Sequence, residues 1–228
     1  MFVSRSMSRK VVTVEKDAGL LQAKNLMDEH QIRHLPVVDR ENRLVGVVTD
    51  RDLRSALPLA LLKGGSHPGE EEKYAHLKVT DVMTPNPMTI QPTHTLQDAL
   101  LLIQEKKVGA FPVVDEKGVL KGILSVRDLL RAFINVMGIG EPGTLLCVLM
   151  EEKVGQMKKI VDVITAENIS MGSILVARYW EKDKRAVFPY LLTNNVTRIK
   201  KKLQEMGFEI LDPMKWYLDQ LPQSDEAV

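Results

Sequence analysis

The chain has 228 residues, which is enough for one large domain or two of ordinary size. Its content of 44% hydrophobic and 27% charged residues is typical of a globular protein, and its net charge of +1 argues neither for nor against a charged partner. The single cysteine, Cys147, excludes an intramolecular disulfide, and no apolar run reaches the roughly 20 residues that span a bilayer.

The N-terminal part of the chain predicts a unit of strands and helices. Its elements, in chain order, are a strand at 11–14, a helix starting near residue 20, strands at 35–38 and 44–48 joined by a turn at 39–42, and a helix that opens at residue 50. Asp17 is the predicted N-cap of the first helix, in which Leu20, Ala23 and Met27 form an apolar stripe. Pro36 suits the first residue of its strand.

The same unit returns 76 residues later without a gap. Pro36-Val37-Val38-Asp39 is repeated as Pro112-Val113-Val114-Asp115, and the segment 46–52 is repeated as 122–128. The second copy predicts a strand at 88–90, a helix with N-cap Thr93 and an apolar stripe at 96, 99 and 103, strands at 111–114 and 120–124, and a helix opening at 126. Repetition at a fixed offset indicates a duplicated architecture.

Two breaks rich in glycine and polar residues divide the chain. Residues 63–76 are predicted to form a flexible loop between the copies, and residues 138–142 a linker after the second copy. The remaining sequence predicts the βαββαβ order of a ferredoxin-like sandwich, with strands at 144–150, 170–179, 186–192 and 208–211, helices at 154–165 and 196–206, and a hairpin turn at 182–184. We expect the polar tail, 214–228, to be frayed.

Residues 3–133 resemble a tandem pair of CBS domains, the Bateman module, because each copy has the Pro-Val-Val-Asp strand and a Gly-x-x-Thr/Ser-x-x-Asp signature. Residues 143–213 resemble an ACT domain, through Gly155-Gln156-Met157 and the Asn168-Ile169 sequence before the second strand. This order is similar to that of bacterial acetoin-utilisation proteins. The resemblance implies an α/β (α+β) fold with CBS domains at 1–62 and 77–137, an ACT-like domain at 143–213 and a tail at 214–228.

Each copy places a carboxylate three residues after a hydroxyl, where a strand gives way to a helix. These pairs are Thr49 with Asp52 and Ser125 with Asp128. Amides at a helix start favour a phosphate, the hydroxyl can donate to it, and an ionised carboxylate can accept from a ribose diol. The alternative is that both aspartates only cap their helices. Because copy one has Asp50 where copy two has a valine, we expect the second site to prefer the more highly charged nucleotide.

The resemblance assigns the aspartate to the ribose, the hydroxyl to phosphate and nearby backbone to the adenine. The implied nucleotide-binding residues are Thr13, Val14, Arg33, His34, Leu35, Pro36, Thr49, Arg51, Asp52, Thr89, Ile90, Gly109, Ala110, Phe111, Pro112, Ser125, Arg127 and Asp128. The expected regulatory ligand is an adenine nucleotide (AMP, ADP or ATP) or S-adenosylmethionine. In the ACT-like domain, an amino acid or other small metabolite would contact Gly155, Gln156, Asn168 and Ile169.

The sequence contains no phosphate loop, nucleophile–base pair or metal-ligand motif, so we expect no catalytic residue, no metal and no cofactor besides the regulatory ligand. The leading interpretation is a cytoplasmic regulatory sensor that acts on an unknown target protein, with no nucleic acid or membrane partner. The resemblance implies a homodimer. Two alternatives stay open, a non-sensing subunit that docks onto an enzyme or transporter and a small hydrolase or transferase.

Overall fold

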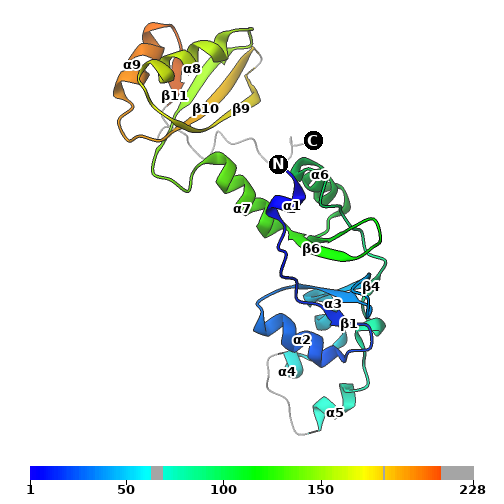
Figure 1. The fold of residues 1–228 in the computed structure, drawn as a ribbon. Coiled ribbons are helices and arrows are strands. Elements are labelled where there is room, and N and C mark those ends of the chain that lie inside the picture. The colour runs from blue at the N-terminus through cyan, green and yellow to red at the C-terminus, as the bar shows by residue number, and fades with distance from the viewer. Residues whose placement is uncertain (63–68, 182, 212–228) are drawn as a thin grey trace. The chain divides into compact units, whose positions relative to one another are not determined.

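The computed structural model describes residues 1–62, 69–181 and 183–211 of the chain (Figure 1). The chain divides into two compact units, residues 1–130 and residues 131–228. The first unit contains most of the repeat, and the second contains the elements that follow it.

Copy one of the repeat is a small sheet packed against a helix. Its elements are β1 (Val14–Glu15), α2 (Leu20–Glu29), β2 (His34–Val38), β3 (Leu44–Thr49), α3 (Asp50–Ala56) and α4 (Leu59–Leu62). β2 pairs in parallel with β1 and antiparallel with β3. The predicted stripe of Leu20, Ala23 and Met27 is buried against these strands, which confirms the amphipathic helix.

Copy two repeats this arrangement. Its elements are α6 (Leu96–Lys106), β5 (Ala110–Val114), β6 (Leu120–Ser125) and α7 (Val126–Met137), which continues from the first unit into the second. β5 and β6 pair antiparallel, whereas the strand predicted at 88–90 is reduced to one parallel bridge between Ile90 and Val113. Both hairpin turns are held by an aspartate, Asp39 or Asp115, whose Oδ1 accepts two backbone N–H groups.

The N-cap predicted for α2 at Asp17 is wrong. The helix begins after Gly19, which has no side chain to cap it. The N–H of Leu20 instead donates to the carbonyl of Leu77 at 2.9 Å. A partner far along the chain therefore replaces the side-chain cap that residue type alone had suggested.

The N-cap predicted for α6 at Thr93 is also wrong, because the helix begins after Thr95. The Thr95 hydroxyl accepts from the Asp98 N–H at 3.1 Å, and Asp98 Oδ2 accepts from the Thr95 N–H at 2.8 Å. This reciprocal capping box satisfies two backbone donors and so decides the helix start.

Pro36 lies in the middle of β2, so its predicted place as the first strand residue is wrong. It pairs with Val47 of β3, and the parallel ladder with β1 begins one residue later, at Val37. Proline has no N–H to donate, and this place ahead of the parallel ladder tolerates it. Pro112 has the same place in β5, where its carbonyl accepts from the Ile90 N–H at 3.1 Å.

The segments that precede the copies pack against the opposite copy. We call residues 1–10 the first arm and residues 77–86 the second arm. The first arm contains α1 (Val3–Ser6) and bridges β6 through the backbones of Ser8 and Ile123, which exchange hydrogen bonds of 2.9 and 3.0 Å. The second arm contains η1 (Val79–Asp81) and β4 (Thr84–Pro85), which pairs with β3. In Figure 1, α1 (blue) accordingly lies beside β6 (green).

This exchange crosses the predicted domain boundaries. Part of the predicted domain 1–62, the first arm, is bonded to copy two. Part of the predicted domain 77–137, the second arm, is bonded to copy one. Two exchanged arms therefore link the copies in addition to the covalent connection.

Methionines from the arms cover the signature glycines. A Cβ at Gly122 would lie 2.6 Å from Met7 Sδ, and a Cβ at Gly46 would collide with Met83. The two methionines are 76 residues apart, as the two glycines are. Neither glycine has a positive φ. Close packing against an arm, rather than backbone conformation, therefore requires glycine at the start of each signature.

Part of the loop predicted at 63–76 is helical. Residues 63–68 lie outside the described part of the chain, and α5 covers Glu70–Tyr74. The loop prediction is wrong for these five residues because glutamate and lysine are good helix formers, whatever glycines and prolines precede them.

The second unit is an antiparallel sheet with two helices on one face. Its elements are β7 (Thr144–Leu145), β8 (Cys147–Glu151), α8 (Gln156–Ala166), β9 (Met171–Glu181), β10 (Lys184–Leu191), α9 (Thr197–Glu205) and β11 (Glu209–Leu211). The strand order is β11–β8–β10–β9, and β7 pairs with the far end of β10. From β8 to β11 the elements follow the predicted βαββαβ order, but the strand predicted at 144–150 is divided at Leu146.

The core of the second unit lies between the helices and the sheet. Ile160 and Ile164 of α8 and Ile199 and Leu203 of α9 are buried against Val148 and its neighbours. The predicted turn residue 182 and the predicted tail 214–228 lie outside the described residues. Within the described ranges, no helix is long and apolar enough to cross a membrane.

Candidate functional site

The site predicted in copy one is a corner where β3 ends and α3 begins. Thr49 is the last residue of β3 and lies opposite His34, the first residue of β2. The N–H of Asp50 donates to the Arg33 carbonyl at 3.1 Å, which ties the helix start to β2. Asp52 Oδ2 accepts from the Thr49 hydroxyl at 2.7 Å and from its N–H at 2.8 Å, and the hydroxyl accepts from the Asp52 N–H at 3.3 Å.

Copy two contains the same corner. Ser125 ends β6 opposite Ala110, and the N–H of Val126 donates to the Gly109 carbonyl at 3.2 Å. Asp128 Oδ2 accepts from the Ser125 hydroxyl at 2.6 Å and from its N–H at 2.8 Å. The structure therefore brings each predicted hydroxyl and carboxylate together, and both aspartates act as caps, which is the role weighed as the alternative.

The remaining oxygen of each carboxylate distinguishes the two corners. Oδ1 of Asp52 accepts no hydrogen bond from the described part of the chain, and Asp52 is half-buried. Oδ1 of Asp128 accepts from the Ser8 hydroxyl of the first arm at 3.2 Å, and Asp128 is 5% exposed. Sequence reasoning missed Ser8. The signal was present, since Val3, Met7 and Ser8 correspond at the same 76-residue offset to a valine, a methionine and a threonine.

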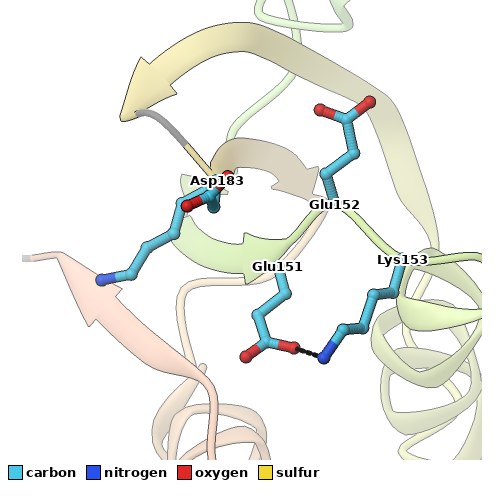
Figure 2. Close-up of a pocket in the computed structure, with 5 residues that line it drawn as sticks. Glu151, Glu152, Lys153 and Asp183 are labelled. Carbon is cyan, nitrogen blue, oxygen red and sulfur yellow. Dashed lines mark ion pairs between the residues drawn. The ribbon is translucent and has the colours of Figure 1, made fainter.

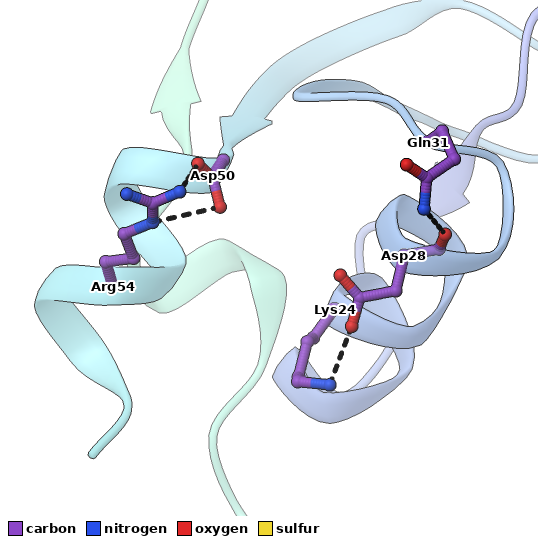
Figure 3. Close-up of polar contacts among 5 residues, drawn as sticks. All are labelled: Lys24, Asp28, Gln31, Asp50 and Arg54. Atoms are coloured by element: carbon purple, nitrogen blue, oxygen red, sulfur yellow. Dashed lines mark hydrogen bonds and ion pairs between the residues drawn. The ribbon is translucent and has the colours of Figure 1, made fainter. Parts of the chain in front are cut away.

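The extra carboxylate of copy one is already paired. Asp50 forms an ion pair with Arg54 one turn along α3, at 2.5 Å (Figure 3). On the neighbouring helix α2, Lys24 pairs with Asp28 at 2.7 Å, and Gln31 donates to the Asp28 carbonyl at 2.9 Å (Figure 3). Because Arg54 offsets the charge of Asp50, the predicted preference of the second site for a more highly charged nucleotide loses much of its electrostatic basis.

The side chain of His34 in copy one lies beside Gly109 in copy two, and both residues belong to the predicted adenine-binding stretches. A Cβ at Gly109 would lie 2.8 Å from His34 Nε2, so the imidazole of copy one occupies the space beside this glycine of copy two. Burial, and next the Arg33 charge, lower the pKa of His34 below its ordinary value, against the opposing effect of Asp50 and Asp52. The lowered pKa therefore favours the neutral form of the imidazole.

The other predicted nucleotide-binding residues differ in how far their side chains are exposed. The residues with buried side chains, which leave only backbone for a ligand, are Val14, Leu35, Pro36, Ile90, Phe111 and Pro112. Thr13 and Thr89 are half-buried next to the first strand position of each copy. Arg51 and Arg127 are exposed in the first turns of α3 and α7. Their roles stay predictions.

The predicted ACT ligand residues fall into two separate groups. Gly155, with φ of +91°, is the N-cap of α8, and Gln156 is its first residue. Asn168 and Ile169 follow the other end of α8. Because an 11-residue helix rises about 16 Å, one copy of the unit does not bring the two groups together.

A charged pocket lies at the end of β8 and the start of β10 in the second unit (Figure 2). Its lining residues are Glu151, Glu152, Lys153, Asp183 and Lys184. Lys153 pairs with Glu151 at 2.6 Å, and Lys184 pairs with a glutamate of β11. The hydrogen bond from Lys153 lowers the pKa of Glu151. None of the four predicted ACT ligand residues lines this pocket, and within the described residues no cluster could hold a metal ion.

The two copies, with their exchanged arms and paired corners, define a duplicated αβ module that offers one carboxylate–hydroxyl pair per copy. The CBS domain family matches residues 3–59 and 79–135, which together make half of the chain. The chain therefore belongs to the CBS domain family, and the predicted tandem pair is confirmed.

Three similar proteins extend this assignment. A CBS domain-containing protein of Dictyostelium discoideum is 35% identical over 137 residues, which cover 60% of this chain and 94% of the relative. The structure of CBSX2 of Arabidopsis thaliana in complex with AMP is 32% identical with a TM-score of 0.50, covering 58% of this chain and 96% of that one. A putative acetoin utilization protein (AcuB) from Vibrio cholerae is 28% identical with a TM-score of 0.51, covering 62% of this chain and 98% of that one.

Proposed function

We propose that this protein is a regulatory sensor that binds an adenine nucleotide, or a related adenosyl ligand, in its CBS pair. The observation that carries the proposal is the pair of equivalent corners, Thr49 with Asp52 and Ser125 with Asp128. CBSX2, which is 32% identical, is described in complex with AMP and supports the choice of ligand.

The chemistry of the corner fits a ribose phosphate. Only Oδ2 of Asp52 is used by the cap, so Oδ1 is an acceptor that can receive a ribose hydroxyl. The N–H groups of Asp50 and Asp52 already have partners, so a phosphate would be bound by Arg51, which is exposed in the first turn of α3 and carries a guanidinium donor. Capping and ligand binding are thus compatible roles of one carboxylate.

Isothermal titration calorimetry with AMP, ATP and S-adenosylmethionine tests the proposal on the full chain. We expect heat with at least one of these ligands, and a loss of affinity of about tenfold or more when Asp52 or Asp128 is replaced by asparagine, which keeps the size of the side chain. Asp98→Asn is the matched control, because Asp98 caps α6 in the same way but lies outside both corners. Wild-type affinity in both corner variants would refute the assignment.

The second candidate is a non-sensing subunit that docks onto an enzyme or transporter. The observation in its favour is that both aspartates already serve as caps and that Asp128 is 5% exposed. Under this function the corners stabilise the helices, and no adenosyl compound gives heat in the titration.

The proposal extends to the rest of the chain. The βαββαβ unit would be an ACT-like domain that binds an amino acid or another small metabolite, with Gly155 and Gln156 of one subunit and Asn168 and Ile169 of its partner at one site, since α8 separates the two pairs. This requires a homodimer, which analytical ultracentrifugation measures. Ligand coupling between the modules would then be reciprocal.

The similarity to the AcuB protein supports a link to acetoin utilisation. The target protein and a cytoplasmic location belong to the same proposal.

A further inference from the structure

We infer that Ser8 restricts the nucleotide site of copy two, so that the site of copy one is filled first. The side chain of Ser8 comes from the first arm and donates to Asp128, 120 residues along the chain. The inference rests on the proposed function, because it ranks the two sites that the function requires.

The capacity of the two carboxylates to accept hydrogen bonds is unequal. An ionised carboxylate offers about four acceptor positions, two on each oxygen. Oδ2 of Asp128 accepts two bonds from Ser125, and Oδ1 accepts from Ser8, which leaves at most one position for a ligand. Oδ1 of Asp52 keeps both positions. A ribose diol has two hydroxyl groups to donate, so Asp52 can receive both and Asp128 cannot while Ser8 is bound.

The first arm holds Ser8 in place. Its backbone exchanges hydrogen bonds of 2.9 and 3.0 Å with Ile123 of β6, and Val3 of the same arm is completely buried. Met7 packs over Gly122 immediately before Ser8. The first arm therefore holds the Ser8 hydroxyl next to Asp128, a residue that is only 5% exposed.

The repeat supplies a matched position in copy one. Thr84 lies 76 residues after Ser8, in β4 of the second arm, opposite Val47 of β3. Its side chain donates no hydrogen bond to Asp52 within the described residues, and it is exposed. Both arms thus carry a hydroxyl, but only that of the first arm reaches the carboxylate of its corner.

The consequence is that a ligand in copy two must take the place of the Ser8 hydroxyl. Removing this hydroxyl should tighten binding at copy two by about threefold to tenfold, the range that a net hydrogen bond contributes. Because Ser8 belongs to the first arm, ligand binding in copy two is also linked to the attachment of this arm to β6.

Calorimetric titration of the full chain with AMP tests this order. Asp52→Asn isolates the site of copy two, and Asp128→Asn isolates the site of copy one. In the Asp52→Asn background we expect Ser8→Ala to raise the affinity for AMP, and Ser8→Thr, which keeps the hydroxyl, to leave it unchanged. In the Asp128→Asn background we expect Thr84→Ala to have no effect. Should Ser8→Ala lower the midpoint of unfolding, Ser8→Cys, of similar size and a weak donor, should show the same gain.

The possible results separate the two proposals. Unchanged or weaker binding in Ser8→Ala and Ser8→Cys overturns the restriction by Ser8, and so does equal affinity of the two isolated sites. Absence of heat from the wild type with AMP, ATP and S-adenosylmethionine overturns both this inference and the sensing function.

Discussion

Replacing Gly122 by alanine should destabilise the first unit, because the arm leaves no room for a methyl group. The new Cβ would lie 2.6 Å from Met7 Sδ and 2.9 Å from the Ser8 carbonyl oxygen, whereas ordinary contacts lie at 3.4–4 Å. Overpacking of this kind costs about 1–3 kcal/mol. The loss of glycine flexibility in the unfolded chain offsets about 0.4–1 kcal/mol of it. The expected net decrease in the free energy of unfolding therefore lies at about 0–2.6 kcal/mol, with about 1.3 kcal/mol from the midpoints of the two ranges.

A double-mutant cycle with Met7→Ala isolates the contact. Met7 is half-buried, so its truncation alone should cost about 1–2 kcal/mol, less than for a fully buried methionine. In the double variant the methyl group at 122 occupies space that the methionine has left. The double variant should consequently cost less than the sum of the single variants by about 1 kcal/mol or more.

Urea unfolding followed by far-UV circular dichroism measures these changes. The unfolding midpoint of each single variant should shift to a lower urea concentration. Additivity of the two single variants within about 0.3 kcal/mol would refute the packing of Met7 on Gly122.

Three other measurements test the structure. The pKa of His34 is lower in the folded protein than the ordinary 6.5, so the unfolded state binds more protons between these two values and stability falls as the pH falls through this window. His34→Ala should therefore reduce the loss of stability between pH 7 and pH 5, as measured by urea unfolding. An unchanged pH profile would contradict this. Burial raises the pKa of Cys147 to about 11, so iodoacetamide at pH 8 should alkylate it only after unfolding, and rapid alkylation of the native protein would count against the fold. Thr95→Ala should cost about 1 kcal/mol through loss of the α6 capping box, whereas Thr93→Ala should change stability by less than about 0.5 kcal/mol; equal effects would place the cap elsewhere.

The helix starts illustrate which predictions local sequence supports. The stripe of Leu20, Ala23 and Met27 was correct because burial on one face of a helix imposes a period of 3.6 residues on the sequence. The cap of the same helix was wrong because Leu20 donates to the carbonyl of Leu77, and a contact so far along the chain leaves no periodic pattern.

The candidate site shows the same division. Sequence spacing was sufficient to bring each hydroxyl to its aspartate, since a separation of three residues across a helix start is the geometry of a capping box. It could not distinguish Asp52 from Asp128, because the difference comes from Ser8, which is 120 residues from the carboxylate it contacts.

From the sequence alone one could determine that this protein is a duplication at an offset of 76 residues, with a βαββαβ segment after it, because each element has the hydrophobic period of its own secondary structure. Only the tertiary structure decided that each arm packs on the opposite copy, that a methionine requires each signature glycine, and that α8 separates the two halves of the predicted ACT site. These features depend on contacts between residues distant in sequence, and such contacts are specified by the shape of the folded chain rather than by any local pattern.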